Sequence, residues 1–227
     1  MLLSDTEQGE VEQVWTHPDS TVVLRDYEGT RLTVQSLLTL RPGSWVNDEV
    51  INSYGTLLSC RNPQVLIHNT YFYTLLKLRK TYQTLDLKEI DRIYKRKGVR
   101  TKQIASFFAR KQVLLPVNSY GAHWACYCVD HTRQVLVVYD SMQQEVDPTV
   151  LEYVSAELTR ARGAVTTYPV EQAQCAQQDN FYDCGAFLLL NLRNCVLSQP
   201  LALQQSQISQ ARSLLAWELI NATLKTA

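Results

Sequence analysis

Cys184 is the residue whose setting most clearly suggests nucleophilic chemistry. It stands between a polar loop and an apolar run, where a helix is predicted to begin. The unpaired N–H groups and the dipole at a helix start stabilise a thiolate, especially beside a histidine. Gly185 would let a substrate backbone approach closely. A free cysteine is also a common core residue, so this position alone leaves both interpretations open.

His123 and Asp140 could supply the acid–base partners of such a thiol. His123 begins a strand predicted over 123–129, and Asp140 follows the strand predicted over 135–139. A tight turn joins the two strands, so they should be antiparallel neighbours with these residues at one edge. A carboxylate there would hold the imidazole tautomer and stabilise its charged form. Asp130 is the rival acid, but it falls in the turn at the far end of the hairpin.

Gln178 lies six residues before Cys184 in the same polar loop. A side-chain amide at that place could donate to an oxyanion, together with the backbone N–H of the nucleophile. Each of these residues has an ordinary structural explanation when taken alone. Their joint arrangement favours acyl-transfer chemistry.

The elements that must position these residues indicate an α+β domain, with strands in the middle of the chain and helices on both sides. Helices are predicted over about 47–58, 86–97, 147–163, 184–197 and 209–224, and strands over 113–117, 123–129, 135–139 and 164–170. Residues 1–20 are polar and are expected to be frayed or loosely docked. The range 21–227 is then one domain.

Length and composition exclude several classes of protein. The 227 residues are 45% hydrophobic and 19% charged, which is ordinary for one soluble domain and excludes a disordered chain, a collagen or a coiled coil. No apolar run approaches the roughly 18–20 residues of a membrane span. The acidic start lacks the features of a signal peptide. Six cysteines without a CxxC pair indicate reduced thiols in an intracellular compartment, and no zinc site.

The charge of the chain is unevenly distributed. Residues 77–111 hold 12 of the 22 basic residues and three acids, a net +9, and the rest carries −9. This basic segment has three interpretations. It could be a set of solvated helix faces, a nucleic-acid patch or localisation signal around 95–97, or a docking surface for an acidic partner.

Several blocks beyond these residues complete a wider pattern. They are His123-Trp124, Tyr139-Asp140-Ser141, Gln178-Asp179-Asn180-Phe181-Tyr182-Asp183-Cys184-Gly185, Trp45-Val46-Asn47-Asp48-Glu49-Val50-Ile51-Asn52, Asn69-Thr70-Tyr71-Phe72-Tyr73, Leu115-Pro116-Val117-Asn118, and a tail with Gln204-Gln205, Arg212 and Trp217-Glu218-Leu219-Ile220. In this order they resemble the ubiquitin-like-protein proteases, the SUMO (sentrin) protease family of cysteine peptidases. The resemblance runs from about residue 21 to the C-terminus. Phe181 departs from it, because the family has a glycine there.

The resemblance implies a papain-like fold of the ubiquitin-like-protein protease type, with a central mixed sheet flanked by helices. It implies that Cys184 is the nucleophile, His123 the general base, Asp140 its orienting acid and Gln178 the oxyanion donor. Trp45 and Trp124 match tryptophans that form a narrow tunnel over a Gly-Gly tail, in which only glycine fits. No metal or cofactor is needed.

The implied activity is that of a thiol isopeptidase that cleaves after the C-terminal Gly-Gly of a ubiquitin-like modifier, with SUMO favoured. Arg92, Lys95 and Arg96 in the basic segment are candidates for docking the acidic face of SUMO. The expected protein is a monomer of the nucleus or cytoplasm, or one delivered into a host cell, with no obligatory nucleic-acid or membrane partner. The alternatives are a protease for ubiquitin or the neddylation modifier, a thiol acetyltransferase, and a non-catalytic module that binds a modifier.

Overall fold

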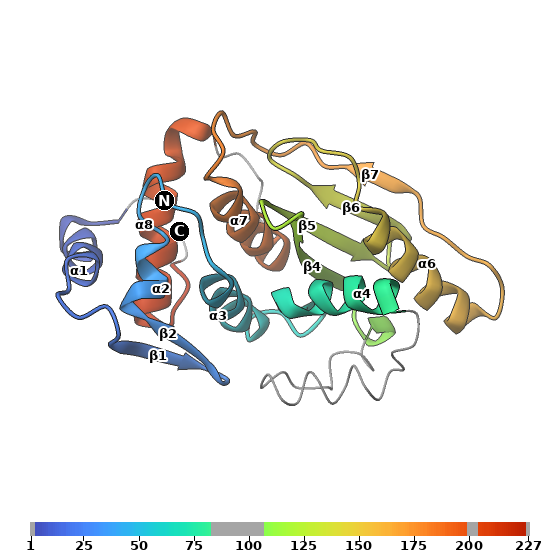
Figure 1. Cartoon of the computed structure of the whole chain (residues 1–227), viewed down its shortest axis with the longest axis horizontal. Coiled ribbons are helices and arrows are strands. Elements are labelled where there is room, and N and C mark those ends of the chain that lie inside the picture. Colours follow the sequence, from blue (N-terminus) through green and yellow to red (C-terminus); the bar gives the residue numbers. More distant parts are fainter. Residues whose placement is uncertain (1–2, 83–106, 199–203, 226–227) are drawn as a thin grey trace. The chain divides into compact units, whose positions relative to one another are not determined.

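The computed structural model describes residues 3–82, 107–198 and 204–225 (Figure 1). The chain divides into two compact units, named here by their place in the sequence. The terminal unit combines residues 1–62 with 175–227, and the central unit is residues 63–174. The single domain predicted over 21–227 stays a prediction. Among the described residues, no helix has the length and apolar character that a membrane crossing requires.

The central unit is built on a five-stranded mixed sheet with the strand order β3-β4-β5-β6-β7. Its strands are β3 (Val65–Ile67), β4 (Gln112–Ser119), β5 (His123–Asp130), β6 (Val135–Tyr139) and β7 (Val170–Gln172). The strands β4, β5 and β6 pair antiparallel, whereas β3 and β7 add in parallel at the edges. All eight residues of β5 are buried. The sequence predicted the three inner strands correctly.

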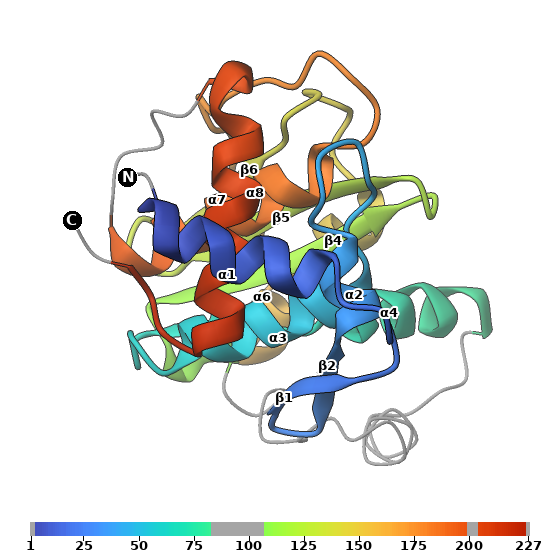
Figure 2. The same cartoon turned by 90° about the vertical axis from the view of Figure 1, so that its left-hand side faces the viewer.

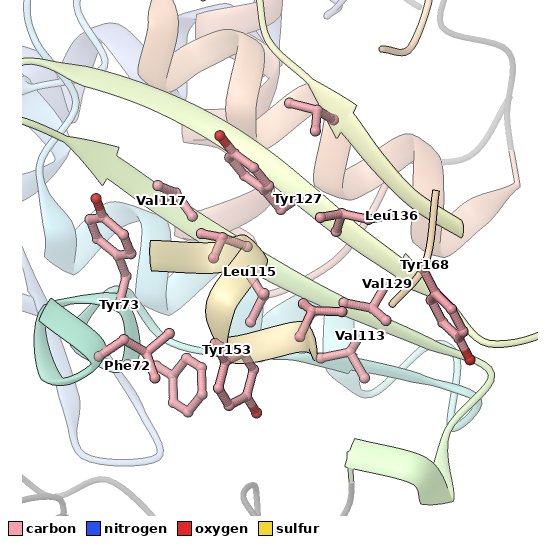
Figure 3. Close-up of a cluster of buried hydrophobic side chains, with 14 of the residues drawn as sticks. Phe72, Tyr73, Val113, Leu115, Val117, Tyr127, Val129, Leu136, Tyr153 and Tyr168 are labelled. Atoms are coloured by element: carbon pink, nitrogen blue, oxygen red, sulfur yellow. The ribbon is translucent and has the colours of Figure 1, made fainter. Parts of the chain in front are cut away.

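Two helices of the central unit, α4 (Thr70–Tyr82) and α6 (Pro148–Arg162), pack against the sheet. Figure 3 shows alternate residues of β4 meeting Phe72 of α4 and Tyr153 of α6 in one apolar cluster. The helix α6 is capped at both ends, as its sequence predicts. Asp147 caps its start through the N–H of Thr149, and Gly163 ends it in the left-handed conformation at φ 69°.

The terminal unit is mostly helical. It contains α1 (Asp5–Trp15), the hairpin β1 (Val23–Tyr27) and β2 (Thr30–Thr33), α2 (Val34–Leu38), α3 (Asp48–Ser59), α7 (Cys184–Leu197), the short 3₁₀ helix η2 (Gln205–Gln207) and α8 (Ile208–Asn221). The helices α3, α7 and α8 contact one another. Helices over these three ranges were predicted from the apolar spacing, and α7 has the predicted bounds.

The first twenty residues differ from their prediction as a frayed, loosely docked segment. Residues 5–15 form α1, whose start is fixed by a capping box between Ser4 and Glu7. Figure 2 shows α1 lying across α8, with which it is in contact. Val11 and Trp15 are buried, and Trp15 Nε1 donates to the carbonyl of Leu37 at 3.3 Å. Two well-placed apolar residues hold an otherwise polar helix.

The strand predicted over 164–170 is also wrong. Only Val170 of that range belongs to a strand, because β7 covers Val170–Gln172. The backbone of Thr166 is engaged by side chains instead of a strand partner: its N–H donates to Thr159 Oγ1 at 3.1 Å, and its carbonyl accepts from Ser155 Oγ at 3.3 Å. The helix predicted over 86–97 lies outside the described residues.

Candidate active site

His123 and Asp140 form a buried pair at one edge of the central sheet. The register pairs Cys126 with Tyr139, so Asp140, the next residue along, comes close to the start of β5. His123 Nε2 and Asp140 Oδ1 are 2.6 Å apart, and both side chains are almost fully buried. The juxtaposition predicted from the hairpin is therefore confirmed.

The loop after β6 holds the Asp140 carboxylate. Its Oδ1 accepts from the backbone N–H of Met142 at 2.8 Å, and its Oδ2 accepts from that of Gln144 at 3.1 Å. Burial raises the pKa of Asp140, but hydrogen bonds from His123 and from the two amides outweigh burial, so this pKa is lowered. The carboxyl group is consequently ionised at neutral pH.

The ionised Asp140 sets the tautomer of His123. A carboxylate can only accept, so the proton of a neutral imidazole must lie on Nε2, and Nδ1 then carries the lone pair. This is the arrangement of a general base that is oriented by an acid. The rival acid, Asp130, lies at the other end of β5. Its Oδ1 caps the turn by accepting from Thr132 and Arg133 N–H groups, both at 2.9 Å.

Cys184 is the first residue of α7 and is 2% exposed. The preceding residue, Asp183, makes no side-chain capping bond to this helix. The carboxylate of Asp183 is instead paired with Arg212, whose Nε lies 2.8 Å from Asp183 Oδ1. The predicted location of this cysteine at a helix start is confirmed.

The loop before Cys184 contains the predicted oxyanion donor. Gln178 is partly buried, and its Nε2 donates to the carbonyl of Asn180 at 2.6 Å. Its neighbour Gln177 is exposed, and the Nε2 of Gln177 donates to the carbonyl of Cys175 at 3.0 Å. Phe181, the departure from the family pattern, is 75% exposed. Its ring therefore projects toward solvent and does not fill the interior of the loop.

The two tryptophans predicted to line a tunnel differ in exposure. Trp45 is 51% exposed and precedes Asn47, the N-cap of α3. Trp124 is 5% exposed and pairs with Asn118 across β4 and β5. The candidate docking residues Arg92, Lys95 and Arg96 lie outside the described residues.

The predicted site residues therefore fall in two groups. The structure brings His123 and Asp140 together in the central unit, whereas Gln178, in a loop, and Cys184, at the start of α7 that follows this loop, belong to the terminal unit. The sequence analysis missed Asn180, whose Oδ1 accepts from the N–H groups of Tyr182 and Asp183, each at 3.1 Å. An asparagine whose side chain accepts hydrogen bonds from the backbone two and three residues later forms an Asx turn, and an asparagine in such a loop is a recognisable signal of this turn.

The chain is similar in sequence to two curated proteases. The chain is 27% identical over 98% of its length to sentrin-specific protease 2 of Pongo abelii, and 23% identical over 98% to ubiquitin-like-specific protease 1 of Saccharomyces cerevisiae. It spans 38% and 35% of the length of these two relatives.

The fold is that of a solved family member. The C-terminal Ulp1 protease domain, solved in complex with Smt3, the yeast ortholog of SUMO, superposes with a TM-score of 0.79 at 21% identity, covering 99% of this chain and 98% of the other. Residues 44–221 match the family described as "Ulp1 protease family, C-terminal catalytic domain". This chain therefore belongs to the Ulp1 protease family.

Proposed function

We propose that this chain is a thiol protease that cleaves after the C-terminal Gly-Gly of a ubiquitin-like modifier, with SUMO as the favoured modifier. The observation that carries the proposal is the buried 2.6 Å pair of His123 and Asp140, which orients an imidazole as a general base. A module that only binds a modifier has no use for such a pair.

In the proposed reaction, Cys184 passes its proton to Nδ1 of His123 and attacks the carbonyl carbon of the terminal glycine. Gln178 and backbone N–H groups stabilise the oxyanion. His123 then gives the proton to the leaving lysine amine, and a thioester forms between Cys184 and the modifier. In the second half, His123 takes a proton from water, whose oxygen attacks the thioester. The thiol and the free carboxylate of the modifier are released.

Two observations support SUMO as the modifier. The relatives are named as sentrin-specific and ubiquitin-like-specific proteases, and the similar solved domain was captured with a SUMO ortholog. The +9 charge of residues 77–111 would attract a modifier with an acidic face.

The two tryptophans would select the diglycine itself. The half-exposed ring of Trp45 would cover one side of the diglycine and Trp124 would cover the other, so that any side chain on the substrate at this point would clash.

We further propose that the chain works as a monomer in the nucleus or cytoplasm. All six cysteines lie among the described residues and none is joined in a disulfide, which supports a reducing compartment. The reaction proposed above draws every proton and nucleophile from the chain, its substrate and water.

The test is a panel of modifier probes that carry a vinyl sulfone at the C-terminus, with SUMO, ubiquitin and the neddylation modifier side by side. The wild-type chain should be captured covalently, and fastest by SUMO. Cys184→Ala should abolish capture and turnover while it leaves modifier binding largely intact, because only the sulfur is lost. Faster capture by another modifier would replace SUMO as the substrate.

Cys175→Ala is the matched control, because Cys175 is a cysteine of the same unit, nine residues upstream and outside any disulfide. It should keep wild-type capture and turnover. Near-normal cleavage by Cys184→Ala would show that the proposed mechanism is wrong, and absence of capture by all three modifiers would reject the protease function itself.

A further inference from the structure

Arg212 on α8 is one of the largest fully buried side chains among the described residues, and the reaction proposed above does not use it. Its Nε donates to Asp183 Oδ1 at 2.8 Å. Asp183 is itself buried and stands directly before Cys184. A buried guanidinium thus neutralises the carboxylate next to the proposed nucleophile. Buried ion pairs are seldom retained for stability alone, because desolvation offsets most of their attraction.

The remaining N–H groups of Arg212 bind two other stretches of backbone. Its Nη1 donates to the carbonyls of Thr39 and Arg41, at 3.3 and 3.2 Å. Its Nη2 donates to the carbonyls of Ser44 and Tyr182, both at 2.9 Å. With the Nε bond, these contacts employ all five donors of the guanidinium.

Three of the five acceptor residues of Arg212 lie one or two positions before a proposed site residue. Ser44 is the residue before Trp45, and Tyr182 and Asp183 are the two residues before Cys184. One side chain therefore fixes the backbone that leads into the proposed diglycine clamp and the backbone that leads into the proposed nucleophile. Both segments belong to the terminal unit.

The second carboxylate oxygen of Asp183 also accepts hydrogen bonds. Its Oδ2 accepts from Asn180 Nδ2 at 2.7 Å and from Gln205 Nε2 at 2.8 Å. Gln205 lies in η2, directly before α8. The carboxylate is thus fixed through both oxygens, and the contact from Gln205 reaches only the nucleophile side of the network.

We propose that Arg212 is a positioning residue that sets the Trp45 segment and the Cys184 segment in one register, so that substrate clamp and nucleophile share a single anchor. This inference rests on the proposed function. It predicts that loss of the planar five-donor fork impairs both substrate binding and the chemical step. Lysine at this position keeps the charge but has three donors on a single atom and cannot replace the fork.

The experiment compares Arg212→Lys with Arg193→Lys. Arg193 is another buried arginine of the same unit, and it binds Glu218 at 3.2 Å and the carbonyl of Lys225. Glu218 and Lys225 are not adjacent in sequence to Trp45 or Cys184, so this variant controls for the loss of a buried arginine. Competent enzyme is counted by stoichiometric capture with the vinyl sulfone probe, and kcat and KM are then expressed per competent site.

Per competent site, Arg212→Lys should lower kcat by about 10- to 100-fold and raise KM several-fold, because a displacement on the order of 1 Å is sufficient for such losses. Arg193→Lys should lose stability but keep the wild-type kcat and KM. If Arg212→Lys matches Arg193→Lys in both constants, Arg212 is only structural and the inference is wrong, while wild-type capture still supports the proposed function.

Gln205→Ala provides a second test if Arg212→Lys does not fold. It removes one contact to Asp183 and none to the Trp45 segment. It should lower kcat by roughly 3- to 10-fold with KM within about twofold of wild type, because it loosens only the nucleophile side. An unchanged kcat would contradict the shared-anchor role.

Discussion

The side-chain amide of Gln178 has two hydrogens, and one of them is directed to the carbonyl of Asn180 at 2.6 Å. That bond orients the amide of the proposed oxyanion donor. We therefore expect Gln178→Ala to lower kcat by about 10²–10³, the usual effect of removing one such donor. Steady-state kinetics on a modifier substrate measure this.

Gln177→Ala is the matched control, because Gln177 is the neighbouring glutamine, is exposed, and directs its Nε2 to the carbonyl and Sγ of Cys175. Its effect on kcat should be less than about twofold. A large loss in Gln177→Ala with a small one in Gln178→Ala would mean that the oxyanion donor has been assigned to the wrong glutamine.

His68 is a titratable group outside the proposed chemistry. It is buried and stacked on Phe72 with ring centroids 3.9 Å apart, and neither ring nitrogen has a hydrogen-bond partner among the described residues. Burial lowers the pKa of His68 from 6.5 to about 3. The folded state therefore disfavours the charged ring. The stability that the folded state gains from keeping His68 neutral is fully present above the unfolded pKa of 6.5. It is lost as the pH falls toward 3.

We expect His68→Leu to remove this dependence. Between about pH 7 and pH 4.5 the wild-type chain should lose roughly 2–3 kcal/mol of unfolding free energy that the variant keeps. Urea unfolding at both pH values measures the difference. His17→Leu, an exposed control, should follow the wild-type curve. Parallel pH profiles for His68→Leu and wild type would contradict the expected burial effect.

Among the elements, α1 shows that a mostly polar helix can dock on its neighbour α8 with only two buried apolar residues. Its inner face has Val11 and Trp15, and its outer face is polar. We expect Val11→Asp to cost about 3–5 kcal/mol of unfolding free energy, because it buries an unpaired carboxylate against the terminal unit. Gln13→Asp, on the exposed face of the same helix, should stay within about 0.5 kcal/mol. Equal effects would show that α1 is not held by its apolar face.

The accuracy of the sequence predictions follows from how local each signal is. The bounds of α6 are set by Asp147, Pro148 and Gly163, which act on their own backbone, and α7 is marked by a sharp change from polar to apolar residues. The helix α1 was missed because its partner, α8, lies about two hundred residues away in sequence. The strand over 164–170 failed because Thr159 and Ser155 engage the backbone of Thr166.

The candidate site shows the same division. The pairing of His123 with Asp140 follows from a hairpin, so it could be predicted from the sequence. The amides of Met142 and Gln144 that hold Asp140 could not, because the loop after β6 carries no pattern that fixes its path. Nor could the contacts of Arg212, which join residues 29 to 173 positions apart.

For the molecule as a whole, the uneven charge predicts a salt effect. Steering by the +9 segment acts mainly on association and is screened over a Debye length of about 8 Å at 0.15 M salt. We expect kcat/KM on a SUMO substrate to fall steeply between low salt and roughly 0.3 M. Changing Arg92, Lys95 and Arg96 together to Glu should flatten this dependence and raise KM more than it lowers kcat.

A short peptide that ends in Gly-Gly is the control substrate, because it lacks the acidic face of SUMO on which the steering would act. Its cleavage should change little with salt or with the triple reversal. An unchanged SUMO rate and salt slope in the reversed chain would make the segment a solvated surface and would remove the electrostatic support for SUMO.

The discontinuous make-up of the terminal unit has a consequence for the newly made chain. The central unit is one continuous stretch, so all its residues emerge from the ribosome before Cys175. The terminal unit must wait, because Arg25 and Tyr27 of β1 bond to the carbonyls of Ile220 and Leu219 near the end of the chain. Synthesis of the chain therefore delivers His123 and Asp140 before the residues that complete the terminal unit around Cys184.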